Sequence, residues 1–184
     1  KYISHIRINS QSGRGGVSYV LKNSFGLILP DKMKEEVGYL MKNVSDHRHA
    51  ELSPEDMRDV FKETYVDVDK KFDVSECHFK QKDGIGAEVT IVADGKETVV
   101  DSHGNGRLNA VNHAIKKYFN LDYALDVYEE HSLSKRSDAQ AISYVGIKPA
   151  GQEKLYWGAG TDDDIIQSSI DALVNAVNRY MKVK

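Results

Sequence analysis

The chain has 184 residues, of which 40% are hydrophobic and 29% are charged, which is the composition of an ordinary soluble globular protein. Its formal net charge of −3 gives no strong electrostatic attraction to nucleic acid or to an anionic membrane, so we expect neither as a partner. The single cysteine, Cys77, excludes a disulfide framework within the chain and fits a reducing compartment, so we expect the cytoplasm. The first residues contain neither an initiator methionine nor a signal-peptide core, and we expect the chain to be part of a longer protein.

Residues 1–66 predict a small helical linker subdomain. Tyr2–Asn9 alternates in hydrophobicity like a short strand or extended arm, and the polar, glycine-rich Asn9–Gly16 predicts a loop. Three helices are expected after this loop, beginning near Val17, at Pro30-Asp31 and at Ser53-Pro54. The third begins with serine at the N-cap, proline at the first helical position and an acid three residues after the serine, the pattern of a capping box.

Residues 67–184 predict a duplicated βββα domain, with one unit at 67–120 and the other at 121–184. Each unit contains three β-rich segments followed by an amphipathic helix, which ends at Tyr118 in the first unit and at Tyr180 in the second. An internal repeat of this kind indicates that one supersecondary unit occurs twice. The expected fold class is therefore α+β, with a helical N-terminal subdomain followed by the duplicated βββα domain.

A pair of glycines precedes each of the two repeated helices. His103-Gly104-Asn105-Gly106 and Trp157-Gly158-Ala159-Gly160 are both expected to form strand-to-helix turns, with equivalent glycines 54 residues apart (158 − 104). The N-terminus of a helix attracts a carboxylate or phosphate through its N–H groups and its dipole. The second helix begins with the acidic run Thr161–Asp164, whereas the first begins with Arg107 and has no acid. The first turn is therefore the better candidate for an anion.

The sequence offers no catalytic constellation and no convincing metal site. His47 and His49 have a ligand-like spacing, but they stand in a charged segment between helices without a second ligand pair. Cys77 belongs to no recognised nucleophile motif. The polar run 132–138 is equally compatible with a loop that closes over a ligand and with an ordinary hairpin turn. We therefore expect no catalytic residue and no metal ligand in this chain.

Several runs of residues resemble the regulatory region of 2-isopropylmalate synthase, in the same order along the chain. They are Ile8–Tyr19, Gly26–Pro30, Gly104–Gly106, Glu130–Ser134, Asp138–Ala141 and Trp157–Gly160. The resemblance implies an enzyme of leucine biosynthesis that joins acetyl-CoA to 2-oxoisovalerate, of which this chain is the non-catalytic, C-terminal regulatory part. The catalytic barrel, which carries the catalytic groups and a divalent metal in that family, is absent here. The resemblance thus implies a chain that uses no cofactor of its own and is inactive alone.

The resemblance also implies an effector site and a partner. L-leucine, the end product, would bind between units of two subunits, so the expected assembly is a homodimer. The positions that match the family's effector pocket are Gly104, Gly106, Leu108, Ala110, Leu125, Tyr128, Ser132, Ala139 and Ala141. Arg107, where the family has proline, and Ser132, where it has a smaller apolar residue, bear on which amino acid fits. Tyr19 is expected to reach the active site of a neighbouring subunit.

Three alternatives remain open from the sequence alone. The same fold at the end of a citramalate synthase would sense isoleucine instead of leucine. A module that only dimerises would bind no amino acid. A free-standing enzyme would catalyse the acetyl-CoA condensation by itself, and we expect no such activity.

Overall fold

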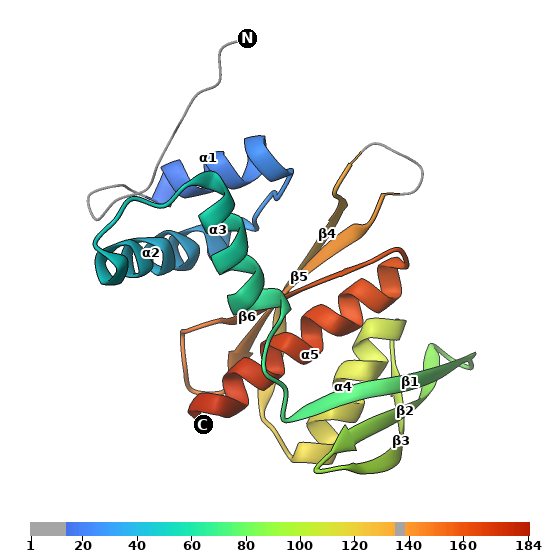
Figure 1. Ribbon diagram of the computed structural model, residues 1–184. Helices are drawn as coiled ribbons and strands as arrows, with labels where there is room; N and C mark the ends of the chain where they lie inside the picture. Colours follow the sequence, from blue (N-terminus) through green and yellow to red (C-terminus); the bar gives the residue numbers. More distant parts are fainter. Residues whose placement is uncertain (1–13, 135–138) are drawn as a thin grey trace. The chain divides into compact units, whose positions relative to one another are not determined.

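The structure is a computed structural model that describes residues 14–134 and 139–184 (Figure 1). Its contacts divide the chain into two compact units. The first unit contains the described residues up to Thr64 together with those of His131–Ala139, and the second contains Tyr65–Glu130 and Gln140–Lys184. This division differs from the expected boundary after residue 66, and it places the described residues of the segment 131–139 with the helices. The arm predicted at Tyr2–Asn9 lies outside the described residues.

The first unit contains three helices that begin close to where the sequence predicts them. They are α1 (Arg14–Phe25), α2 (Asp31–Arg48) and α3 (Pro54–Phe61), and the short π-helix η1 (Lys62–Val66) follows. The capping box at α3 is present, because the Asp56 N–H donates to Ser53 Oγ at 3.1 Å and the Ser53 N–H donates to Asp56 Oδ2 at 3.0 Å. Three fully buried methionines contribute to its apolar interior, namely Met33, Met41 and Met57.

The second unit contains the two predicted βββα repeats, which confirms the α+β class. The first repeat consists of β1 (Phe72–Gln81), β2 (Ile85–Ala93), β3 (Lys96–Gly104) and α4 (Arg107–Phe119). The second consists of β4 (Tyr123–Ser132), β5 (Ala141–Pro149), β6 (Tyr156–Asp162) and α5 (Ile165–Val183). Each repeat forms a three-stranded sheet whose strands lie in chain order. Among the described residues, no helix has both the length and the apolar character needed to cross a membrane.

The hairpin between β2 and β3 forms at the predicted two-residue turn. Asp94 and Gly95 both have positive φ, 52° and 73°, as a type I′ turn requires. The turn places Ala93 opposite Lys96 and sets the antiparallel register up to the pair Ile85 and Gly104. The end of β3, from which α4 starts, is therefore fixed by local sequence nine residues away in the hairpin.

The two repeats share one hydrophobic core around their helices. In Figure 1, α4 and α5 lie between the two sheets, with α4 packed on β2 and β3 and α5 packed on β5 and β6. Side chains of both repeats belong to the same core cluster, including Val89, Val111, Ile147 and Leu173. Neither helix buries its apolar face within its own repeat alone, so the repeats depend on each other for stability.

One sequence expectation about the repeat is wrong. Gly158-Ala159-Gly160 does not form a strand-to-helix turn, because all three residues lie inside β6. A Cβ on Gly158 would lie 2.3 Å from the Ala176 nitrogen, and one on Gly160 would lie 2.4 Å from the Ser168 oxygen. These glycines therefore allow α5 to approach the sheet closely. The true equivalence joins the two N-caps, Gly106 and Asp164, which are 58 residues apart (164 − 106).

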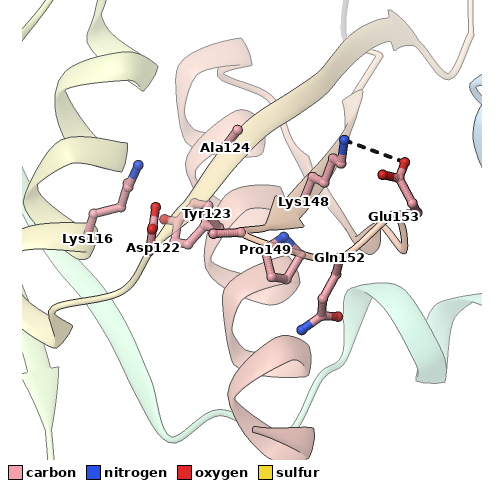
Figure 2. A pocket seen from close by; sticks show the side chains of 10 residues that line it. Lys116, Asp122, Tyr123, Ala124, Lys148, Pro149, Gln152 and Glu153 are labelled. Carbon is pink, nitrogen blue, oxygen red and sulfur yellow. Dashed lines mark ion pairs between the residues drawn. The ribbon is translucent and has the colours of Figure 1, made fainter.

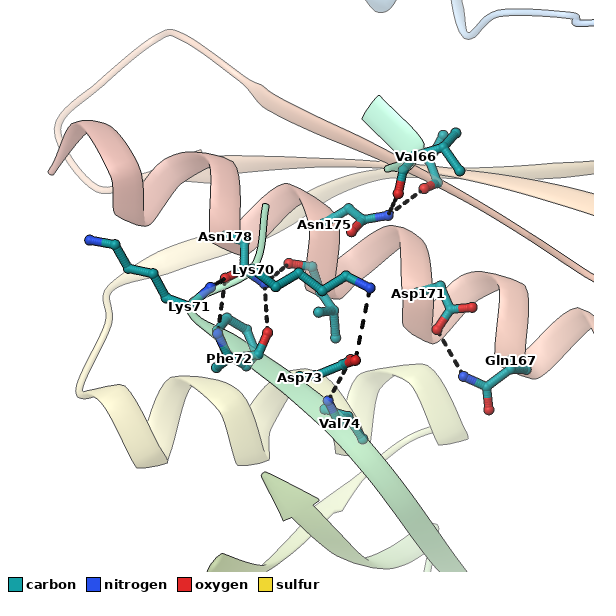
Figure 3. Close-up of polar contacts among 12 residues, drawn as sticks. Val66, Lys70, Lys71, Phe72, Asp73, Val74, Gln167, Asp171, Asn175 and Asn178 are labelled. Atoms are coloured by element: carbon teal, nitrogen blue, oxygen red, sulfur yellow. Dashed lines mark hydrogen bonds and ion pairs between the residues drawn. The ribbon is translucent and has the colours of Figure 1, made fainter. Parts of the chain in front are cut away.

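The connector between η1 and β1 is held by two buried asparagines of α5 (Figure 3). Asn178 accepts hydrogen bonds from the Lys71 and Phe72 N–H groups at 2.7 and 3.2 Å and donates to the Phe72 carbonyl at 2.9 Å. Asn175 donates to the Val66 carbonyl at 3.0 Å. The connector thus belongs to the second unit by its hydrogen bonds as well as by its packing.

Candidate functional site

The first predicted glycine turn joins β3 to α4, and its first glycine has a packing role. Gly104 is buried at the end of β3, and a Cβ there would lie 2.5 Å from Asn109 Oδ1 and 2.6 Å from the Ala110 nitrogen. Asn109 Oδ1 also accepts the Asn105 N–H at 3.1 Å, which ties the turn to the first turn of α4. Gly104 is therefore required for the close approach of strand and helix, independently of any ligand.

The second glycine of this turn, Gly106, leaves the start of α4 open. It is the N-cap of α4, and a Cβ built on it meets no atom within 4 Å among the described residues. Its φ of −148° is an extended conformation that any residue adopts, so backbone geometry does not demand glycine here. Because glycine has no side chain to accept hydrogen bonds, the orphan N–H groups of the first turn receive no side-chain cap from it.

The start of α5 differs in the way the sequence predicts. Asp164 Oδ1 accepts the Ile166 N–H at 2.8 Å, and Asp162 Oδ1 accepts the Asp164 N–H at 2.9 Å. The carboxylates of the chain itself therefore occupy this N-terminus, where an anionic ligand would meet repulsion. Of the two repeated helices, α4 has the N-terminus that suits a carboxylate.

Two histidines and a serine form hydrogen-bond contacts at the end of β3, next to this turn. The His103 ring nitrogen Nε2 lies 2.7 Å from the Asp83 carbonyl oxygen, and His113 Nδ1 lies 2.6 Å from the His103 carbonyl oxygen. Ser102 Oγ donates to the Ala110 carbonyl at 2.7 Å. These contacts tie the end of β3 to the loop between β1 and β2 and to α4.

Leu108 and Ala110, the other residues predicted at this turn, face the interior to different degrees. Ala110 is fully buried in the core that both repeats share. Leu108 is half-buried and packs against the same core. The structure thus brings Gly104 and Ala110 into direct proximity, with Gly106 at the rim and open.

A second group of predicted residues lies on β4 and β5 near the start of α5. Tyr128 is 38% exposed, and its hydroxyl donates to Glu130 and lies near the hydroxyls of Ser143 and Ser169. Partial burial, and then the neighbouring Glu130 carboxylate, raise the pKa of Tyr128 to about 12. Ser143 Oγ lies 2.7 Å from Ser168 Oγ, and both serines are buried.

Sequence reasoning missed these serines because buried hydroxyls on a strand and a helix carry no motif. Leu125 of β4 is half-buried against the shared core, and Ala141 of β5 is buried opposite Asp162 of β6. Ala141 and Ser143 lie on the same face of β5, because side chains of a strand alternate. This group presents a neutral polar cluster at the edge of an apolar core.

The remaining predicted residues belong to the first unit. Ser132 is the exposed last residue of β4, and Ala139 is half-buried outside regular structure. Tyr19 lies on α1 and is 48% exposed. The roles of these three residues, like those of the other effector-site residues, stay predictions.

The two pockets below, found among the described residues, are not lined by predicted effector residues. One, of about 540 Å³, lies at the C-terminal end of α4, beyond Lys116 (Figure 2). Lys116 Nζ is 5.2 Å from the centroid of the Tyr123 ring, and Lys148 pairs with Glu153 across 3.7 Å. A smaller one, of about 220 Å³, is lined by His103 and its neighbours on the first sheet but not by Gly104 or Gly106.

The part of the chain that the structure describes contains no group of three or more histidine, cysteine, aspartate or glutamate side chains that could hold a metal. His47, which the sequence places at a ligand-like spacing from His49, instead contacts the Asn43 carbonyl oxygen through Nδ1 at 3.3 Å. Burial, and then the Glu76 charge, raise the pKa of the Cys77 thiol to about 11, which opposes a nucleophilic role.

Comparison with known proteins assigns the chain to a family. The family described as LeuA allosteric (dimerisation) domain matches residues 51–181. The chain is 41% identical to the 2-isopropylmalate synthase of Desulfitobacterium hafniense over 96% of its length, and 39% identical to that of Helicobacter hepaticus over 96%. The 2-isopropylmalate synthase of Schizosaccharomyces pombe is 34% identical over 97%.

The match covers nearly all of this chain but only part of each relative. The chain spans 32%, 33% and 32% of these three relatives, which is about a third of each. The family match itself runs from shortly before α3 to the last turn of α5, and so includes both βββα repeats. The chain therefore belongs to the LeuA allosteric (dimerisation) domain family.

Proposed function

We propose that this chain is the amino-acid-sensing and dimerisation part of a 2-isopropylmalate synthase, with L-leucine as its effector. The match of residues 51–181 to an allosteric, dimerising domain carries the proposal, because the relatives that match nearly the whole chain bear that enzyme's name. The condensation of acetyl-CoA with 2-oxoisovalerate, and the divalent metal it is expected to use, then belong to the other two thirds of such an enzyme. We accordingly propose that the isolated chain is catalytically inactive and works in the cytoplasm.

The open start of α4 supports a site for the effector's carboxylate. The N-terminal N–H groups and the helix dipole favour a negative charge, and the first turn contains Arg107 and no acid. Gly106 leaves space for a ligand to approach the backbone. A zwitterionic amino acid also needs an apolar contact, for which the half-buried Leu108 and Leu125 are the proposed partners.

Burial of an aliphatic side chain sets the selectivity that such a site can reach. Burying a leucine side chain contributes about 1.5–3 kcal/mol relative to leaving it exposed. That is enough to discriminate leucine from alanine but not, by area alone, from isoleucine or valine, so pocket shape must supply that discrimination. Inhibition further requires that leucine bind the less active arrangement of the enzyme more tightly than the active one.

Calorimetric titration of the chain with leucine and isoleucine tests this proposal. We expect leucine to bind at least tenfold more tightly. Isoleucine binding tenfold more tightly would identify an isoleucine sensor of the citramalate synthase type. A melting temperature unchanged by millimolar leucine would identify a dimerisation module without a ligand, because a ligand of the native state must raise its stability.

A matched pair of variants at Gly106 tests where the ligand binds. Gly106→Asp and Gly106→Asn both supply a favourable N-cap oxygen at a position where a side chain meets no obstruction, so both are expected to fold. The aspartate carboxylate would occupy the place of the ligand's own and abolish the heat of binding. The neutral asparagine separates this charge effect from the steric effect, and we expect it to retain more binding. Undiminished leucine binding by Gly106→Asp would contradict the placement at α4.

Dimerisation is tested separately by sedimentation equilibrium. We propose a homodimer because the family is described as a dimerisation domain. The expected result is the mass of two chains, with or without leucine. A monomer at all accessible concentrations would show that this chain does not dimerise alone.

A further inference from the structure

Strand β4 passes from one compact unit into the other. The strand runs without interruption over Tyr123–Ser132, but the division by contacts falls between Glu130 and His131. Tyr128, which the resemblance predicts as an effector contact, therefore lies on the second unit's side of this division, and His131, three residues later, lies with the helices. A change at Tyr128 has a direct covalent route along one strand to the helical unit.

His131 forms a specific contact with the loop between α1 and α2. The Ile28 N–H donates to His131 Nε2 across 3.2 Å, although the two residues are 103 positions apart in the sequence. Nδ1 of the same ring lies 3.0 Å from the Ser132 carbonyl oxygen. A ring that accepts at Nε2 must carry its proton at Nδ1 and donate it to that carbonyl, so one neutral tautomer satisfies both contacts. The ring is thus fixed at both nitrogens.

The loop that His131 contacts packs closely against the segment that follows β4 and buries two of its leucines. Gly26 has a φ of 70°, and a Cβ on it would lie 3.0 Å from the Leu133 carbonyl oxygen. Leu27 and Leu29 are buried, whereas Ile28 between them is 49% exposed, so its main chain is fixed without burial of its side chain. A displacement of His131 must therefore move this loop or break its hydrogen bond.

We infer that His131 is a positioning residue that transmits the effector-bound state of β4 to the α1–α2 loop. This inference rests on the proposed leucine site and adds its route to the helical unit, which carries Tyr19 on α1. The device is a single hydrogen bond between a strand that approaches the ligand and a loop that joins two helices. Coupling of this kind requires that the loop have two arrangements that the ligand biases differently.

Amide hydrogen exchange of this chain by NMR, with and without leucine, tests the inference. We expect leucine to change the exchange rates of residues 27–29 in the wild-type chain. His131→Leu removes the acceptor and should speed exchange of the Ile28 amide about two- to tenfold, the effect of one hydrogen bond. His131→Gln places an oxygen acceptor near the position of Nε2 and should restore both the protection and the leucine response. His47→Leu, which replaces a histidine of α2, is the matched control and should behave as wild type.

Calorimetry on the same samples separates the possible failures. In support of the inference, His131→Leu should bind leucine within a few-fold of the wild-type affinity while its loop no longer responds. If leucine binds the wild-type chain but leaves the loop's exchange unchanged, or if the loop of His131→Leu responds as in the wild type, the inference is overturned and the proposed function stands. If leucine produces no heat with the wild-type chain, the proposed function fails and the inference fails with it. A melting curve and His131→Gln show whether any loss reflects folding.

Discussion

Replacement of Asn178 by alanine should strongly destabilise the second unit. Asn178 is fully buried on α5, and its amide forms hydrogen bonds with the connector that leads into β1 (Figure 3). Its oxygen accepts from Lys71 and Phe72, and its nitrogen donates to the carbonyls of Phe72 and Val174. Alanine removes all four hydrogen bonds at once and leaves the main chain of Phe72 without these partners.

The expected magnitude depends on the groups that are left unpaired. Phe72 is buried, so both its N–H and its carbonyl lose a partner away from water, at about 1–3 kcal/mol for each group. Lys71 is exposed, and its N–H can bond to water instead. Val174 is four residues before Asn178 on the same helix, so its carbonyl keeps its helical hydrogen bond. Asn178→Ala should therefore lower the free energy of unfolding by about 3–4 kcal/mol.

Asn175→Ala is the matched control on the same helix. Asn175 donates to the carbonyls of Val66 and Ala159, but its own oxygen is buried without a hydrogen-bond partner among the described residues. Alanine at 175 therefore removes an unsatisfied group as well as two hydrogen bonds, and these effects oppose each other. The side-chain volume lost is the same in both variants. We expect Asn175→Ala to cost about 2 kcal/mol less than Asn178→Ala.

Urea denaturation followed by circular dichroism measures both variants. The slope of the free energy against urea should stay constant, so that the change in midpoint reports stability. If Asn178→Ala unfolds within about 1 kcal/mol of the wild type, the amide does not carry the connector. An equal loss in both variants would show that the buried volume matters and the hydrogen bonds do not.

Three further predictions concern Cys77, Asp171 and the glycine at position 158. The raised pKa of Cys77, about 11, predicts a thiolate population at pH 8 that is about 100-fold lower than in the unfolded chain. A disulfide reagent should therefore label Cys77 slowly in the native protein. Equal labelling rates with and without denaturant would contradict this. Burial raises the pKa of Asp171, so the native state binds its proton more tightly, and the stability of the wild type falls as pH rises from about 4 through the native pKa. Asp171→Asn should therefore be more stable than the wild type at pH 7, and this gain should be lost below about pH 3.5. Urea midpoints measured at both pH values check the prediction. Gly158→Ala places its Cβ 2.4 Å from the Ala172 oxygen and should lower the free energy of unfolding by about 2 kcal/mol or more. Gly106→Ala, whose Cβ meets open space, should stay within about 1 kcal/mol of the wild type. Similar melting temperatures for the two variants would refute the close packing of α5 on β6.

Local sequence was sufficient wherever a structural element is decided by its neighbours in the chain. The hairpin at Asp94-Gly95 and the capping box at Ser53 involve residues at most three positions apart, and both form as predicted. The order of three strands and a helix, repeated once, was predicted in the same way from periodicity. Family membership was also accessible, because the characteristic runs recur in order along the chain.

The glycine pair of the second repeat shows where such reasoning ends. Gly104 and Gly158 occur in similar sequence contexts and both allow a helix to approach closely, yet Gly104 ends a strand next to a turn and Gly158 lies inside β6. Glycine supplies conformational freedom in a turn and close approach in packing, and the sequence does not distinguish these uses. Only the position of α5 against the sheet decides that Gly158 serves packing.

By itself, the sequence determined the elements, their duplication, the α+β class and the difference in charge between the two helix starts. The tertiary structure decided which distant groups meet, namely Asn178 with Phe72, His131 with Ile28, and Ser143 with Ser168. The physical reason is that propensity and capping act over a few residues, whereas these hydrogen bonds join polar groups that the folded core brings together. Which main-chain groups need a partner, and which side chains supply it, is settled only when the core closes.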